Sequence, residues 1–125
     1  MAAARYSFIV EQGATTNIQL KWEDASGSIN LSGYSGRMQI RPTVDSSTVY
    51  LTLSSSLDVD GTGLNMSGSD GVTAVQSGSI GIYISAATSS LLNFDTAYYD
   101  LEMVSGNEVT RLLEGQVKLS KNVTR

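Results

Sequence analysis

The sequence contains no cysteine, no histidine and a single proline, Pro42, among its 125 residues. Without cysteine the chain has no disulfides, no thiol nucleophile and no thiolate ligand for a metal. Without histidine it lacks the commonest general base and the commonest metal ligand. Any catalysis would have to use carboxylates, lysines or hydroxyls. We therefore expect the chain not to be an enzyme, and we expect neither a cofactor nor a metal.

Charged residues are also scarce, at 16% of the chain, and the net charge is −4. A nucleic-acid binder needs a basic stripe that neutralises phosphates. Eight lysines and arginines scattered among twelve acidic residues do not supply one, so nucleic acid is not an expected partner. Much of the polar surface must consist of Ser, Thr, Asn, Gln and Gly, which cost less to bury against a neighbour than charged groups do.

Long apolar runs are missing as well. None approaches the roughly 18 residues that a membrane span needs. At the N-terminus, Arg5 is followed by only a short apolar stretch at residues 6–10, which is too short for the core of a signal peptide. We expect no membrane contact and no secretion, with synthesis and assembly in the cytoplasm.

What the sequence does contain is apolar residues at every second position, the pattern of half-buried strands. The residues that this alternation places inward are Tyr6, Phe8, Val10, Ile18, Leu20, Trp22, Met38, Ile40, Val49, Leu51, Leu53, Ile80, Ile82, Ile84, Tyr99, Leu101, Met103, Leu113, Val117 and Leu119. About seven such strands, with no long amphipathic helix, predict an all-β fold, an antiparallel β-sandwich.

Turn signals separate these strands. Pro42 ends one strand because proline cannot donate to a ladder, and residues 105–107 (Ser-Gly-Asn) predict a hairpin turn. Residues 85–92 form the one predicted helical turn, with Ser85 as its N-cap. The length suits one domain, and no internal repeat or long linker divides the chain. We expect a single domain over residues 1–125, with residues 1–4 as a short arm.

Acidic residues give two candidate sites. Asp58, Asp60 and Asp70 could offer oxygens to Ca²⁺, but the twelve-residue loop pattern fails, since Thr62 and Ser69 stand at its fifth and twelfth positions. The favoured interpretation is a glycine-rich turn in which aspartate caps backbone donors, and cation binding is left open.

The second acidic candidate is the pair Asp100 and Glu102, which share one strand face about 6.5–7 Å apart. That separation is near the one found in inverting glycosidases. Carboxylates that act in catalysis face each other across a cleft, whereas these are neighbours on one exposed face. We favour a cross-strand ion pair with Arg111 on the adjoining hairpin strand.

A partner-binding surface is predicted from side chains that the same alternation places outward. Arg37 and Arg41 lie on one strand, where they could pair with a partner's acids. Tyr50, Tyr83 and Tyr98 also point outward, and exposed tyrosines on strands suit protein or glycan contacts.

Two regions go beyond general sandwich patterns. The first comprises residues 12–22 (QGATTNIQLKW) and 31–42 (LSGYSGRMQIRP), and the second residues 99–103 (YDLEM), 109–117 (VTRLLEGQV) and 123–125 (VTR). They resemble the opening and the closing hairpin of small virion proteins of tailed phages. That group is similar to the N-terminal, immunoglobulin-like domain of phage upper baseplate proteins, which fixes receptor-binding parts onto the tail.

The resemblance covers residues 5–125 and implies an immunoglobulin-like sandwich that acts as a virion structural protein. Upper baseplate proteins continue into a helical or fibre-like region, whereas this chain stops at Arg125. The resemblance therefore implies a tail or baseplate adaptor that anchors fibre or receptor-binding components by protein–protein contacts. Its expected location is the virion, assembled in the host cytoplasm, and its expected partners are other phage structural proteins and further copies of itself.

Two alternative functions remain open. One is a capsid-decorating or head-to-tail (neck) protein of the same fold. The other is a carbohydrate-binding module that recognises a glycan through Tyr50, Tyr83 or Tyr98.

Overall fold

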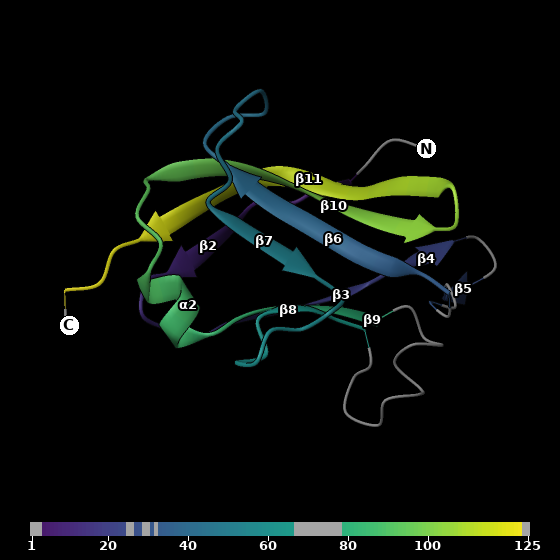
Figure 1. Ribbon diagram of the computed structural model, residues 1–125, viewed down its shortest axis with the longest axis horizontal. Coiled ribbons are helices and arrows are strands. Elements are labelled where there is room, and N and C mark those ends of the chain that lie inside the picture. Colours follow the sequence, from purple (N-terminus) through teal and green to yellow (C-terminus); the bar gives the residue numbers. More distant parts are fainter. Residues whose placement is uncertain (1–3, 25–26, 29–30, 32, 67–78, 124–125) are drawn as a thin grey trace.

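The computed structural model describes residues 4–24, 27–28, 31, 33–66 and 79–123. Most of these residues lie in strands, and the described helix, α2 (Ala86–Ser90), is a single short one. The fold is therefore all-β, as predicted. Two main sheets lie one above the other, and α2 lies at one end of them (Figure 1).

The larger sheet has the strand order β1-β11-β10-β6-β7, and β2 also pairs with β11. Its strands are β1 (Ala4–Arg5), β2 (Phe8–Glu11), β6 (Ser35–Arg41), β7 (Leu51–Ser54), β10 (Thr96–Ser105) and β11 (Glu108–Ser120). The long β10–β11 hairpin forms the middle of this sheet. Its turn consists of Gly106 and Asn107, and Gly106 has a φ of 58°, which suits the first central position of a two-residue hairpin turn. The predicted hairpin is confirmed.

The smaller sheet has the order β3-β9-β8, with strands β3 (Thr16–Lys21), β8 (Gly63–Asn65) and β9 (Ser79–Ile84). A separate pair is formed by β4 (Glu23–Asp24) and β5 (Gly27–Ser28). Helix α2 leads from β9 of the smaller sheet to β10 of the larger one. Its predicted N-cap is confirmed, because the Ser85 hydroxyl accepts a hydrogen bond from the Thr88 N–H at 3.1 Å.

The larger sheet is mixed, so the prediction of an antiparallel sandwich holds for the smaller sheet and is wrong for part of the larger one. Both β1 and β2 run parallel to β11, with Ala4 opposite Leu113 and Phe8 opposite Val117. Ala4, predicted to lie in the arm, therefore belongs to a strand. Alternation fixes which side chains face inward, but it does not fix the partner or its direction. A parallel pair needs a long connection, and nearly the whole chain separates β2 from β11.

The core lies between the two sheets, and most of the predicted inward residues are buried in it. Those confirmed are Phe8, Val10, Met38, Ile40, Leu53, Ile80, Ile82, Ile84, Tyr99, Leu101, Met103, Val117 and Leu119, while Ile18, Leu20, Trp22, Leu51 and Leu113 pack against them half-buried. Val49, which lies before β7 begins, is half-buried and is not part of this core. Tyr6 is a second exception, since it is 39% exposed. It lies where the chain bends between β1 and β2, and the alternation is interrupted there.

Candidate partner-binding face

The outer face of the larger sheet gathers polar side chains on its two central strands. Because β6 and β10 pair in register, these polar residues stand directly opposite one another on the two strands. The pairs are Arg37 with Glu102, Gln39 with Asp100 and Arg41 with Tyr98. Buried residues alternate with them along both strands. The sequence therefore builds an apolar inner face and a polar outer face from the same two segments. We call this outer surface the β6–β10 face.

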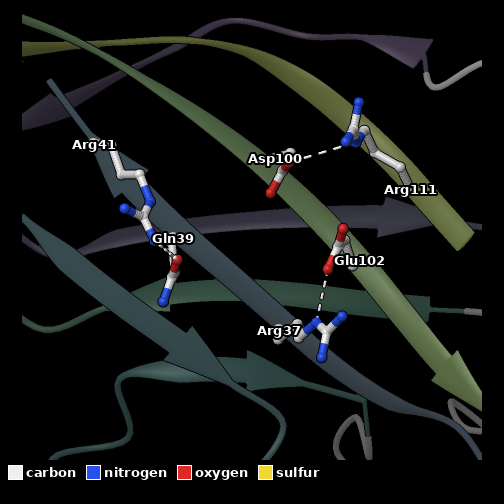
Figure 2. A network of polar contacts seen from close by, with 6 residues as sticks. All are labelled: Arg37, Gln39, Arg41, Asp100, Glu102 and Arg111. Atoms are coloured by element: carbon white, nitrogen blue, oxygen red, sulfur yellow. Dashed lines mark hydrogen bonds and ion pairs between the residues drawn. The ribbon is translucent and has the colours of Figure 1, made fainter. Parts of the chain in front are cut away.

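Two ion pairs cross the β6–β10 face (Figure 2). The Arg37 Nε donates to Glu102 Oε1 at 2.7 Å, and the Arg37 side chain is 56% exposed. The Arg111 Nε lies 3.4 Å from Asp100 Oδ2. The predicted cross-strand ion pair of Arg111 with the acidic pair on β10 is confirmed, and the carboxylate that it contacts is that of Asp100. Ion pairs as exposed as these contribute about 0–1 kcal/mol each to the stability of the fold. Their main effect is to fix the positions of the charged side chains on the surface.

A β-bulge explains which carboxylate Arg111 contacts. Leu101 pairs with Leu113 and Glu102 pairs with Arg111, so β11 carries one extra residue, Leu112, at this point. A bulge bends its strand and redirects neighbouring side chains. Arg111 stands opposite Glu102 in the ladder, yet its guanidinium contacts Asp100 and leaves Glu102 to Arg37.

Arg41 is held within the chain. Its Nη1 donates to the Ser46 carbonyl oxygen and its Nη2 donates to Gln39 Oε1, both at 2.6 Å. The first bond ties the loop that follows β6 to the end of that strand. Arg41 therefore positions the loop, and its guanidinium is already engaged within the chain.

The loop and the sheet enclose a shallow hollow of about 370 Å³. Its lining includes Val44, which is 81% exposed, together with Arg41, Tyr98, Asp100 and Arg111. Burial raises the pKa of Asp100 above its ordinary value; the nearby Glu102 carboxylate adds to the rise, and Arg111 opposes it. The β6–β10 face thus combines paired charges of both signs with one apolar side chain at its rim.

The five predicted interface residues do not all meet on the β6–β10 face. Arg37, Arg41 and Tyr98 lie on it. Tyr50 was predicted to point outward and does not: its ring stacks on Phe94 at 4.8 Å between centroids and packs against the core. It precedes β7, in a bend where alternation no longer applies. Tyr83 lies on the smaller sheet.

Sequence reasoning missed the contributions of Gln39 and of the Arg37–Glu102 pair. Both depend on β6 lying beside β10 in this register. The available signal was one predicted strand with two arginines, Arg37 and Arg41, and another with two acidic residues, Asp100 and Glu102. About 60 residues separate the two segments, so the sequence alone did not show that they pair.

Asp60 has a structural role. Its carboxylate accepts hydrogen bonds from the Ser85 hydroxyl at 2.5 Å, the Thr88 hydroxyl at 2.8 Å and the Thr62 N–H at 3.0 Å. These bonds join the loop before β8 to the start of α2. The predicted capping of a backbone donor by aspartate is confirmed for Asp60, while Asp70 lies outside the described residues.

The hydrogen bonds to Asp60 hold its pKa far below the ordinary value, the bond from Ser85 contributing most. A carboxylate with a lowered pKa stabilises the fold above its unfolded pKa of about 3.9 and loses that contribution as the pH falls toward its folded pKa. We expect Asp60→Asn to lower the free energy of unfolding at pH 6–7, and the difference from wild type to shrink below about pH 4. Urea unfolding between pH 2.5 and 7 measures this.

The matched control is Asp58→Asn in the same loop, because the Asp58 carboxylate accepts none of these hydrogen bonds. It should leave the pH profile of wild type unchanged. A difference between wild type and Asp60→Asn that stays constant across the whole pH range would contradict the assignment.

Comparison with known proteins adds no relative: no protein-family model and no curated protein matches this sequence. Within the described part of the chain, no helix has the length and apolar character needed to cross a membrane. The same residues include no cluster of three or more acidic side chains that could hold a metal ion.

Proposed function

We propose that the chain is a structural protein of a tailed-phage virion, a tail or baseplate adaptor with an immunoglobulin-like domain. It holds fibre or receptor-binding components in place through protein–protein contacts. Its partners are other virion proteins and further copies of itself.

The strand order is the observation that carries this proposal. If β3, β6, β7, β8, β9, β10 and β11 are taken as strands B, C, C′, D, E, F and G, one sheet contains B, E and D and the other contains G, F, C and C′. That is how immunoglobulin-like domains divide their strands between two sheets. The resemblance to upper baseplate domains requires this arrangement, and a different strand order would have removed its support.

The domain departs from antibody domains in how its core is fastened. There is no cysteine to form the disulfide between strands B and F. Instead, the hydroxyl of Tyr99 on β10 donates to the carbonyl oxygen of Tyr6 at 2.5 Å, and the Tyr99 ring meets Phe8 edge-on at 5.1 Å. These contacts fasten the N-terminal segment to the larger sheet.

The β6–β10 face is the proposed docking surface. Its charges are already paired within the chain. Burying this face against a neighbour therefore leaves few charges without a partner, and buried unpaired charges are the main free-energy cost of burying ions. Arg37 and Arg111 are both exposed cations on this face, at 56% and 55%, and we take Arg37 as the one that a partner's acid contacts. Many copies around a tail would each contribute a modest interface, and multivalency would supply the remaining affinity.

The test is incorporation of Arg37→Glu into particles. This change removes the pair with Glu102 and places two carboxylates together, which costs little at an exposed site, about 1 kcal/mol or less. The chain should fold, while a partner acid facing Arg37 is repelled. We expect incorporation to fall by about tenfold or more, measured by quantitative mass spectrometry of purified particles.

The matched control is Lys121→Glu. Lys121 is also half exposed and paired with an acid, its Nζ lying 3.3 Å from Asp95 Oδ1, but it lies outside the β6–β10 face. This variant should enter particles normally. Wild-type incorporation of Arg37→Glu would show that the face is ordinary solvated surface. Arg41→Glu is not informative, because it would also release the loop at Ser46.

A further inference from the structure

The outer face of the smaller sheet carries a second hollow, of about 270 Å³, and the Tyr83 side chain lines it. Pairing of β3, β9 and β8 arranges its floor in two rows across the strands. One row is Asn17, Tyr83 and Gly63, and the other is Gln19, Gly81 and Asn65. One aromatic ring and three carboxamides therefore share this surface. The glycines among them have no side chain, so the surface is hollow at their positions.

Two glycines border the open space of this hollow. At Gly81 an added Cβ would lie 2.9 Å from Gln19 Nε2, inside the hollow. Gly61, in the loop above the sheet, has a φ of +90° and lies so close to the Tyr83 ring that a Cβ would be 3.4 Å from Cε1. Gly61 therefore lies close to the Tyr83 ring, while Gly81 leaves open the space next to the Gln19 side chain.

The hollow is almost uncharged. Among the described residues that line it, only Asp60 is ionisable apart from the tyrosine, and its carboxylate already accepts the three hydrogen bonds that tie it to α2 and Thr62. Gln19 Nε2 donates to Asn17 Oδ1 at 3.1 Å. In the described part of the chain, this is the only hydrogen bond of either amide side chain, so the other amide atoms can bond a ligand.

The other two candidate tyrosines lack such surroundings. The Tyr50 ring is covered by Phe94, and Tyr98 stands opposite Arg41, beside charged groups. Of these three tyrosines, Tyr83 is the one that combines a partly exposed side chain with neutral hydrogen-bonding groups around it.

We propose that the Tyr83 hollow is a binding site for one unit of a neutral glycan. Sugar hydroxyls each donate and accept, as carboxamides do, and the apolar face of a sugar ring can lie against a tyrosine ring. The volume lies just below the usual lower limit for ligand pockets, about 300 Å³, and so suits no more than a single sugar unit. The described residues of its lining include no arginine or lysine that could pair with an acidic sugar.

The experiment uses the full chain on an array of neutral and sialylated oligosaccharides, followed by NMR titration with the strongest neutral ligand. We expect shifts at the Asn17 and Gln19 side-chain amides and at the Gly81 N–H. Tyr83→Ala should weaken binding at least about tenfold, because it removes the ring's apolar contact. Gln19→Ala should weaken it less, and Tyr98→Ala, on the opposite sheet, should leave it unchanged.

Gln19 is exposed, so Gln19→Ala decides the matter if Tyr83→Ala fails to fold. The proposal is overturned by an array on which no neutral glycan binds, or on which only sialylated glycans bind. It is also overturned if binding survives both Tyr83→Ala and Gln19→Ala. None of these results bears on incorporation into particles, so this site and the adaptor function can fail independently.

Discussion

Replacing Leu101 by alanine is expected to destabilise the folded chain by about 2–5 kcal/mol. Leu101 lies in the middle of β10, between Met38 on β6 and Leu113 on β11, and none of its surface is exposed. Truncation removes buried methyl groups and leaves a cavity between the sheets, which a close-packed core cannot fill without strain. Urea unfolding at pH 7, followed by tryptophan fluorescence from Trp22, measures the loss.

Leu91→Ala is the matched control, since it makes the same chemical change at a side chain that is 83% exposed. Its effect should stay within about 0.5 kcal/mol. If the two variants were equally stable, the core would not lie between these two sheets.

The second large effect is expected from Gly115→Ala. A Cβ at Gly115 would lie against the Tyr6 carbonyl group and 3.3 Å from the Ser7 hydroxyl. The close neighbour is backbone, and the same carbonyl accepts the Tyr99 hydroxyl, so it cannot move without breaking that bond. We expect the free energy of unfolding to fall by about 1–3 kcal/mol. We also expect amide hydrogen exchange to speed up, relative to wild type, more at residues 4–11 than in the rest of the chain.

Gly81→Ala serves as its control. Both glycines lie in strands and neither has a positive φ. A Cβ at Gly81, however, would lie 2.9 Å from the end of the flexible Gln19 side chain, and its nearest backbone atom, the Asn65 carbonyl oxygen, would be at an ordinary contact distance of 3.4 Å. This substitution should change stability little. Equal losses at both positions would mean that the close approach of Tyr6 to β11 does not fasten the N-terminal segment.

Much of the core could be predicted from alternation alone. Ile80, Ile82 and Ile84 are all fully buried, and so are Leu101 and Met103, because a strand with one face inward must repeat with period two. Core residues in connections were missed. Leu31, Leu92 and Phe94 are buried, yet they lie outside long strands, where no periodicity marks them.

The candidate surfaces were predicted less completely, for a related reason. Alternation placed Arg37, Tyr83 and Tyr98 correctly on outer faces, because each lies within a regular strand. It failed at Tyr50, one residue before β7 begins. It also could not show that Tyr83 and Tyr98 lie on different sheets, since that depends on pairings between distant segments.

The adaptor proposal expects the genome that carries this sequence to encode tailed-phage particles. Its most direct test is immunogold electron microscopy on those particles, with antibodies raised against the purified domain. We expect gold at the end of the tail, where fibres and receptor-binding components attach. Label over the head would favour the decoration alternative. Unlabelled particles, with the chain left in the soluble fraction of the lysate, would contradict a structural role in the virion.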